Sequence, residues 1–392
     1  MINNLLIAPW LRWTFGILLA LLILLAMITI HEFGHYLAGK ILKFKINEFS
    51  IGFGPAIFKR KNKKTGELFA IRIFPLGGYC SFEGEDGLDE ESENGHTMSE
   101  EPPPQASKEG VFTEKKPWQR IIVLVAGAFM NYVLALLLIL TLFAGYGQSF
   151  VQVRGASVTD EFPAEYSFQE GDILLEANGR SLYLTTDIAQ ALKGKQAGDI
   201  VKFRVARKNG DGGYTKTMQE IMLRADVVVK NSTQVSGVWK SLGIGIEELD
   251  GGSYYMLSTT TYRFGFFETI GRSFVYSFKI MASIFQVLGD LFTGNLGINA
   301  LGGPVTTITM TSQIATSGFQ NFLEISAYIG VNLAFFNLLP LPALDGSKVV
   351  FTAIEWIRGK PINRKVEAII HLVGIVLLFA FAITVDILQF VL

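Results

Sequence analysis

Residues 11–35 read LRWTFGILLALLILLAMITIHEFGH, an apolar run that ends in three ionisable side chains. The run from 11 to 30 has about the twenty apolar residues that a helix needs to cross the hydrocarbon core of a bilayer. A cleaved signal peptide is the alternative, but the run is long, lacks a small-x-small cleavage site and leads straight into a polar motif. We therefore predict a transmembrane helix with a polar end.

The polar motif is His31-Glu32-Phe33-Gly34-His35. On a helix, His31 and His35 lie one turn apart on the same face, so that both imidazoles can bind one zinc ion while Glu32 reaches its bound water. Ionisable groups in an apolar helix are costly unless they face a partner or a cavity. The position therefore favours a metal site over the alternative of an interfacial polar cap.

Three further apolar stretches, at about 118–143, 322–339 and 366–392, predict transmembrane helices. Four crossings place both termini on the same side of the membrane. The chain of 392 residues is 49% hydrophobic, which is too apolar for an ordinary soluble protein and indicates a polytopic α-helical membrane protein. Its formal net charge of -1 shows no excess of one sign that would point to nucleic acid as a partner.

Lysine and arginine indicate the orientation of these helices. Residues 40–64 contain eight of them against one acid, Glu48, and residues 348–365 contain five. Because short cytoplasmic loops are rich in these residues, both segments are predicted to be cytoplasmic. Both termini, and everything between the second and third spans, are then extracytoplasmic, and the histidine pair lies near the cytoplasmic side.

A catalytic zinc ion normally has three protein ligands and a water, so a third ligand is required. The best candidate is Asp345, which follows the Pro-rich segment 337–344 at the inner end of the third span and thus at the depth of the histidine pair. A helix-capping Asp in a Pro-rich turn is the alternative. Glu324 and Glu355 are expected at other depths, and His371 is expected to be a packed or interfacial histidine.

These motifs resemble those of the site-2 protease family of intramembrane zinc metalloproteases, in the bacterial branch that includes the regulator-of-sigma-E protease. The His-Glu-x-x-His motif falls on 31–35, and the family's Asn-x-x-Pro-x-Pro-x-Leu-Asp-Gly motif falls on 337–346. The family's Gly-x-x-x-Asn element falls on Gly127 to Asn131, without the Pro that usually follows the Gly. The resemblance covers nearly the whole chain and implies that Asp345 is the third ligand.

The same resemblance implies Zn2+ as the cofactor, a bacterial cell membrane as the location and single-span membrane proteins as substrates. Trimmed anti-sigma factors and remnant signal peptides are examples, cleaved in regulated intramembrane proteolysis. Glu32 is then the general base that takes a proton from the zinc-bound water. The family's amides imply that Asn131, Asn332 and Asn337 hold the substrate backbone or the oxyanion. Interhelical packing is the alternative, of equal weight for Asn332.

Residues 44–82 alternate strand-like runs with breaks that include Gly77-Gly78. The pattern resembles the family's membrane-dipping β-sheet, whose exposed edge could pair with an unwound substrate. Gly77, Gly78 and Tyr79 are therefore predicted to bind substrate. A purely cytoplasmic β-ribbon is the alternative. The tract that follows, 83–116, is acidic and Pro-rich, and it predicts a disordered cytoplasmic loop.

Residues 148–250 have the character of a soluble domain. Their segment 171–179, GDILLEANG, resembles the PDZ signature, although Ser167-Phe168 replaces the usual Ala-Gly. A PDZ-like domain would bind a peptide or protein ligand along an edge strand. Residues 251–320 are expected to form a connection and, at 262–292, an amphipathic helix on the outer surface of the lipid bilayer. A fifth crossing at 262–292 is the alternative.

The sequence thus predicts four transmembrane helices, a small membrane-associated β-sheet and one inserted PDZ-like domain. The expected segments are 1–43, 44–82, 83–116, 117–147, 148–250, 251–320 and 321–392. Two other functions are alternatives to intramembrane proteolysis. A non-catalytic PDZ adaptor would not need Glu32 or a metal, and a metal-ion transporter would need ligands along a path through the membrane, whereas here they occupy one depth.

Overall fold

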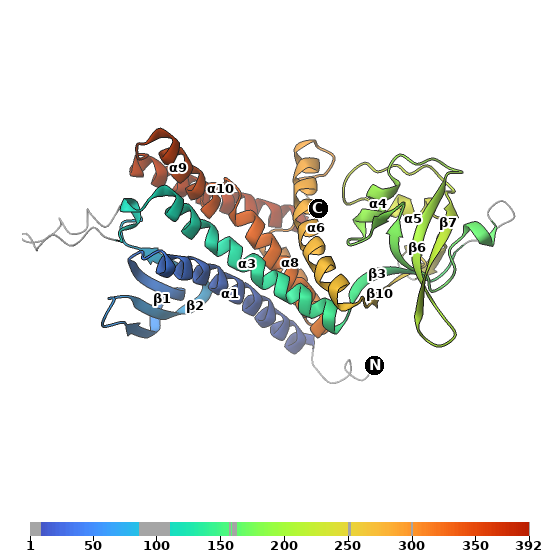
Figure 1. Ribbon diagram of the computed structural model, residues 1–392, viewed down its shortest axis with the longest axis horizontal. Coiled ribbons are helices and arrows are strands. Elements are labelled where there is room, and N and C mark those ends of the chain that lie inside the picture. Colours follow the sequence, from blue (N-terminus) through green and yellow to red (C-terminus); the bar gives the residue numbers. More distant parts are fainter. Residues whose placement is uncertain are drawn as a thin grey trace, which may run out of the picture. The chain divides into compact units, whose positions relative to one another are not determined.

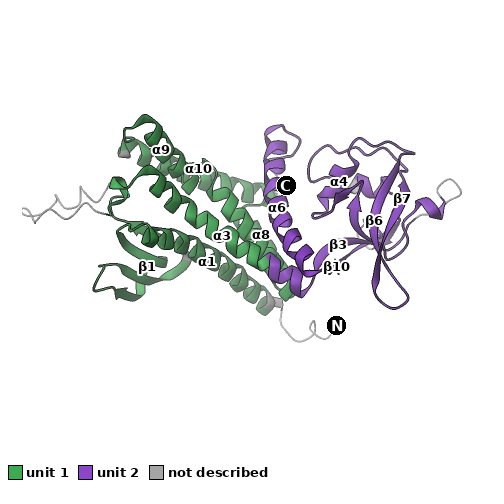
Figure 2. Ribbon diagram, in the orientation of Figure 1, with its two compact units in different colours: residues 1–138, 301–392 green, residues 139–300 purple. Residues whose placement is uncertain are grey.

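The computed structural model describes residues 9–85, 110–156, 158, 163–249, 252–298 and 301–391. The chain divides into two compact units, one made of residues 1–138 and 301–392 and the other of residues 139–300 (Figure 2). Most of the predicted acidic loop lies outside the described residues.

The first unit is a bundle of helices with a β-structure near one end (Figure 1). Its long helices are α1 (Pro9–Ile41), most of α3 (Pro117–Gly145) and α10 (Arg364–Val391). Between α3 and α10 in the chain come α7 (Pro304–Ala315), α8 (Phe319–Asn337) and α9 (Asp345–Arg358). A short 3-10 helix, η1 (Phe112–Glu114), precedes α3.

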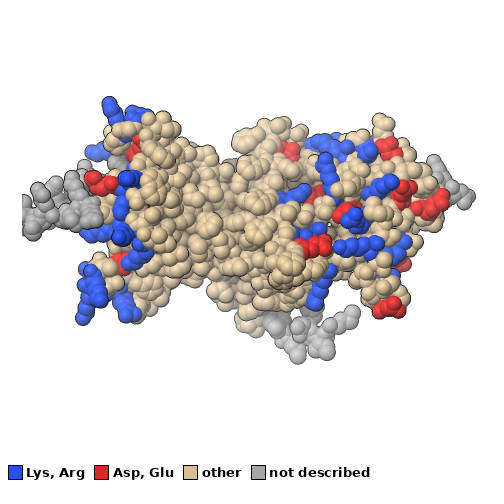
Figure 3. Space-filling model, in the orientation of Figure 1, with Lys and Arg blue, Asp and Glu red and all other residues tan. Residues whose placement is uncertain are grey.

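The outer surface of this bundle is apolar. On α10, side chains such as Leu377 and Phe379 are 64% and 65% exposed, which suits contact with lipid and not with water. Lysine and arginine gather at the end of the bundle that carries α9 and the strands (Figure 3). The rest of the bundle surface in this view is covered by uncharged residues. This distribution follows the positive loops noted in the sequence.

Four helices in the described part of the chain are long and apolar enough to cross a membrane: Trp13–Ile41, Pro117–Gly145, Phe266–Phe292 and Lys365–Gln389. Three of them coincide with predicted spans. The other is the helix that we expected to lie on the surface, whereas the predicted span at 322–339 falls on α8, which this criterion does not select. The physical reason is that α8 contains Asn321, Glu324 and Asn332, which lower its apolar character.

The β-structure of the first unit consists of β1 (Ile46–Lys61) and β2 (Leu68–Phe82). Both strands bend, and the two halves of each strand pair with different segments. In the first half of β1, Phe49 pairs with both Cys80 and Phe69, whereas in the second half Lys59 pairs with Ala70. Gly52 permits the bend in β1, since its φ of +86° is unfavourable for any residue with a Cβ. The segment 78–82 has β1 on one side only, and it therefore forms an edge of this sheet.

The second unit contains a sheet whose strands run in the order β10-β3-β4-β6-β7, with β5 paired to β4. These strands are β3 (Gln148–Val153), β4 (Ile173–Ala177), β5 (Arg180–Ser181), β6 (Ile200–Lys208), β7 (Tyr214–Met222) and β10 (Leu257–Tyr262). A separate pair joins β8 (Ile246–Leu249) to β9 (Gly252–Tyr255). The strands thus continue past residue 250, the boundary expected for this domain.

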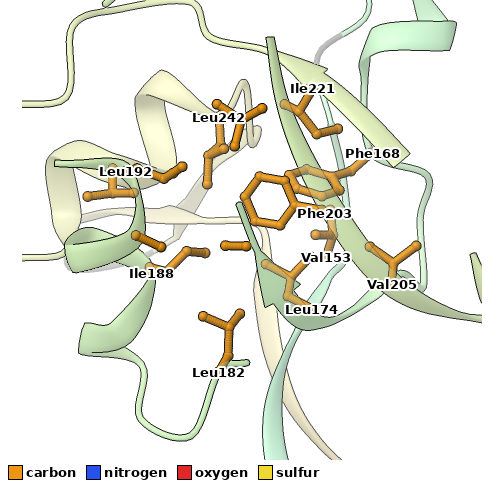
Figure 4. Close-up of a cluster of buried hydrophobic side chains, with 14 of the residues drawn as sticks. Val153, Phe168, Leu174, Leu182, Ile188, Leu192, Phe203, Val205, Ile221 and Leu242 are labelled. Atoms are coloured by element: carbon orange, nitrogen blue, oxygen red, sulfur yellow. The ribbon is translucent and has the colours of Figure 1, made fainter. Parts of the chain in front are cut away.

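A single apolar core holds this second unit together. Its helices are η2 (Ala164–Tyr166), α4 (Thr186–Leu192), α5 (Ser236–Ser241) and the long α6 (Phe266–Phe292). Phe203 of β6 is fully buried among residues such as Phe168, Leu174 and Leu242 (Figure 4). The soluble character of the sequence at 148–250 therefore reflects a real core.

Candidate metal centre

His31 and His35 lie on α1, one helical turn apart, and both are buried. Their Nε2 atoms are 3.1 Å apart. The Oδ2 atom of Asp345, the first residue of α9, lies 2.9 Å from Nε2 of His31 and 3.3 Å from Nε2 of His35. The three residues thus present one ligand atom each within a sphere that suits a single metal ion.

The hydrogen bonds on the far sides of the imidazoles orient these atoms. Nδ1 of His35 lies 2.8 Å from the carbonyl oxygen of Val123, so it must carry the proton, and Nε2 of the neutral ring keeps a lone pair. Nδ1 of His31 lies 3.4 Å from the side-chain amide of Asn337. A flip of this amide exchanges its oxygen and nitrogen, so its oxygen can accept a proton from Nδ1. Two lone pairs and a carboxylate oxygen then converge, and a cation fits among them.

Close packing of α1 against α3 brings the histidines to this point. A Cβ at Gly127 of α3 would overlap Nε2 of His35 and lie 2.8 Å from Cε1 of His31. A Cβ at Gly34 of α1 would overlap the carbonyl oxygen of Ala126. Only glycine fits at either position. The sequence places Gly127 in a motif, but its role in admitting the histidines was not predicted. The available signal was its position four residues, or about one helical turn, before Asn131.

The carboxylate of Asp345 is presented by the turn that joins α8 to α9. A Cβ at Gly346 would overlap the carbonyl oxygen of Leu339 and lie 2.5 Å from that of Leu338, so this glycine lets α9 begin directly against the end of α8.

Glu32 lines a cavity of about 330 Å3 together with His35, Asp345 and residues 79–82 of β2. The backbone amide of Cys80 hydrogen-bonds the Glu32 carboxylate. A Cβ at Gly78 would lie 3.4 Å from Cγ of Glu32, so the strand passes directly beside α1. The carboxylate of Glu32, two of the three candidate ligands and a strand edge therefore line one cavity.

The chain's single cysteine, Cys80, lies in this cavity. Burial raises the pKa of its thiol, and the charges of Glu32 and Glu85 raise it further. A thiol that stays protonated is neither a nucleophile nor a metal ligand. The thiol is not among the three ligand atoms that converge at His31, His35 and Asp345.

The other predicted site residues lie at different distances from this cavity. Tyr79 lines it, and its hydroxyl accepts a hydrogen bond of 3.0 Å from Arg72. Gly77 packs against the ring of Phe53. Asn131 is only 1% exposed, and neither its Nδ2 nor its Oδ1 has a hydrogen-bond partner among the described residues. The Oδ1 of Asn332 is likewise buried without a partner among them.

Known proteins resemble this chain over most of its length. Residues 19–381 match Peptidase family M50. A protein of Clostridium perfringens whose name places it among the zinc metalloproteases is 32% identical over 374 residues, covering 95% of this chain and 97% of the relative. Zinc metalloprotease RasP of Bacillus licheniformis is 28% identical over 430 residues, covering 93% of this chain and 96% of the relative.

The chain belongs to peptidase family M50, the site-2 protease family. It is an intramembrane zinc metalloprotease, and its cofactor is Zn2+. Family membership also agrees with the four apolar helices and the β-structure described above.

Proposed function

We propose that His31, His35 and Asp345 hold the zinc ion and that Glu32 is the general base of peptide hydrolysis. The observation that carries this proposal is the convergence of one ligand atom each from His31, His35 and Asp345, next to a cavity that Glu32 lines. The ligand set leaves a position open for water, which is the arrangement of catalytic zinc sites. Asp345 joins the pair from a segment more than 300 residues away in the chain.

The proposed chemistry assigns one task to each group. Zinc held by these three residues would supply a Lewis acid for the scissile carbonyl and a bound water whose pKa is lowered to about 7. Glu32 accepts the proton of that water and passes it to the leaving amine. The hydrogen bond from the Cys80 amide holds the carboxylate of Glu32 in place for both transfers.

We propose that the substrate binds as an added strand at the edge formed by residues 78–82. The amide of Glu83 donates to the carbonyl of Lys45. Because backbone groups alternate in direction along a strand, the amides and carbonyls of residues 79 and 81 also point toward β1, whereas those of residues 78, 80 and 82 point away from it. That parity agrees with the Cys80 amide reaching Glu32. An unwound substrate could pair with this edge, which would replace the backbone hydrogen bonds that it loses on leaving its helix. Gly77, Gly78 and Tyr79 would then contact the substrate.

The substrates are proposed to be single-span membrane proteins, such as trimmed anti-sigma factors or remnant signal peptides. Asn131, Asn332 and Asn337 are proposed to hold the substrate backbone or the oxyanion. Among the described residues, both amide atoms of Asn131 and Oδ1 of Asn332 are buried without a partner. They support this role, because a buried polar group without a partner is costly unless a ligand pairs with it. Asn337 already contacts His31 and would act beside the metal.

We further propose that α6 lies on the outer membrane surface and that α8 crosses the bilayer, with both termini extracytoplasmic. Along most of its length, α6 bonds to the outer domain that precedes it. The contacts are Arg272 to Gln148 at 2.7 Å, Lys279 to Asp187 at 2.8 Å and Asp290 to the amide of Ser232 at 2.6 Å. A helix bonded to one soluble domain near both of its ends cannot leave that side of the membrane.

The opposite face of α6 is apolar and exposed. Phe267, Phe278 and Phe292 are 85%, 58% and 87% exposed. Such a face suits burial in the interfacial region of a bilayer. By contrast, α8 packs among apolar helices: a Cβ at Gly330 would lie 3.0 Å from Cβ of Ala135 and 3.2 Å from Sδ of Met27. Burial between α1 and α3 explains why a less apolar α8 can cross.

The inserted domain is proposed to be PDZ-like, to bind a peptide or protein ligand and to act as a docking site or size filter for substrates. A cavity of about 370 Å3 in this domain is lined by Arg224, Lys240 and residues 243–246. Burial lowers the pKa of Arg224, which marks a guanidinium partly removed from water. Two cations beside an apolar loop would suit the carboxylate end of a trimmed chain.

Cleavage of a single-span reporter in detergent, with and without a zinc chelator, tests the catalytic assignment. We expect cleavage by the wild type, none after chelation, none by Glu32→Gln, and loss of both cleavage and zinc by Asp345→Asn. Glu32→Gln should keep its zinc, because Glu32 is not a ligand. Unchanged function in Glu32→Gln would support a non-catalytic adaptor instead, and zinc transport without cleavage would support a transporter.

A further inference from the structure

The turn that presents Asp345 is strained and only partly held by its own hydrogen bonds. Ala343 has a φ of +79°, a conformation that a residue with a Cβ rarely adopts and that persists only where the surroundings hold it. Pro340 and Pro342 have no amide hydrogen. The amide of Leu341 donates to Leu339 at 2.7 Å, and that of Leu344 donates to Leu341 at 3.2 Å. Within the turn, these bonds leave the amide of Ala343 to be satisfied from elsewhere.

The last helix, α10, supplies that acceptor. The amide of Ala343 donates to Nδ1 of His371 at 3.1 Å. His371 therefore accepts this hydrogen bond through a ring nitrogen that carries no proton. The ring also lies edge-on to Phe351 of α9, with centroids 5.9 Å apart. One side chain of α10 thus touches both the turn and the helix that begins with Asp345.

A second residue of α10 fits the same turn. Gly374 is three residues after His371, so the two lie on the same face of the helix. A Cβ at Gly374 would overlap Cβ of Pro342 and lie 2.9 Å from its carbonyl carbon. The Pro342 ring therefore packs directly on the backbone of α10, and this contact is independent of the hydrogen bond from Ala343.

We propose that His371 and Gly374 are positioning residues of the metal centre. They hold residues 342–343 of the turn and thereby place the Asp345 carboxylate against His31 and His35. This inference rests on the proposed role of Asp345 as a zinc ligand. Groups that orient a metal ligand without touching the metal typically change metal affinity by about 10–100-fold when they are removed. His371 is thus neither a ligand nor merely a space-filling residue.

The test measures zinc affinity of the full-length protein in detergent, by competition with a chromophoric chelator, alongside the rate of reporter cleavage. His371→Leu removes the acceptor, whereas His371→Asn keeps an acceptor near the place of Nδ1. We expect His371→Leu to weaken zinc binding about 10–100-fold and His371→Asn to restore most of it. Gly374→Ala should also weaken zinc binding, whereas Gly271→Ala on α6, where a Cβ would meet nothing within 4 Å, should not.

Asp345→Asn, measured in parallel, separates the two ideas. If Asp345→Asn loses zinc and His371→Leu binds it as the wild type does, the positioning role is wrong and the ligand assignment stands. Equal losses in His371→Leu and His371→Asn would also overturn the role, because an acceptor would then not matter. If Asp345→Asn itself binds zinc normally, the ligand assignment fails, whatever the His371 variants do.

Discussion

The imidazole of His35 occupies the space in which a side chain at residue 127 would begin. Because a Cβ at Gly127 would overlap Nε2 of His35, the second membrane helix can approach the metal centre only with glycine at this position. The same approach allows the carbonyl of Val123 to accept the hydrogen bond that orients His35. The backbone of α3 is therefore part of the proposed metal centre, although it provides no ligand.

Gly127→Ala tests this relationship. The added methyl group must displace His35, so we expect zinc affinity to fall at least about tenfold, the lower end of the range for residues that support metal ligands. Gly145→Ala on the same helix is the matched control, since a Cβ there would meet nothing within 4 Å. Zinc content after dialysis and reporter cleavage are the measurements. Equal zinc binding in both variants would contradict the proposed packing.

A buried ion pair should stabilise the end of the bundle that carries α9. Arg120 of α3 lies 2.6 Å from Glu355 of α9, and their side chains are only 7% and 6% exposed. Removal of one partner leaves a buried charge, so we expect Arg120→Met to destabilise the protein by about 3–5 kcal/mol. The control is Arg358→Met, which removes an exposed charge at the end of α9. The measurement is the thermal unfolding temperature of each variant in detergent. Equal unfolding temperatures for the two variants would contradict a stabilising role of the ion pair.

The orientation of α6 can be measured by cysteine labelling in a Cys80→Ser background. Asn295 and Lys360 are both exposed, and in the proposed topology they lie on opposite sides of the membrane. A membrane-impermeant maleimide should label Asn295→Cys in intact cells and Lys360→Cys only after permeabilisation. Protection of Asn295→Cys in intact cells, with labelling after permeabilisation, would instead mean that α6 crosses the bilayer.

The cavity of the inserted domain should recognise a free chain end. We expect a peptide with a C-terminal carboxylate to bind more tightly than the same peptide with a C-terminal amide. Lys240→Gln should weaken binding of the carboxylate peptide by about tenfold, the effect of one lost hydrogen bond to a charged group. Lys208→Gln, another exposed lysine of this domain, serves as the control. Fluorescence anisotropy gives the affinities, and equal binding of the two peptides would reject the proposed ligand.

Local spacing alone determined much of the metal centre. A helix of fixed pitch places His31 and His35 on one face, and an apolar run before them places both near the membrane, so neither inference needed a tertiary structure. Asp345 could be proposed as the third ligand because the end of its span and the histidine pair were predicted at the same membrane depth. Two groups at one depth are already matched along the membrane normal. The structure added the contact itself, with Oδ2 of Asp345 at 2.9 Å and 3.3 Å from the two imidazoles.

Contacts between distant segments were decided only by the tertiary structure. The sequence contained Gly127, Gly374 and His371, but a missing side chain or a single acceptor shows its purpose only when its neighbour is known. The same holds for α6, whose composition suits either a surface helix or a span. Its bonds to the outer domain distinguish the two, because hydrogen bonds and ion pairs between segments far apart in the chain leave no periodic pattern in the sequence.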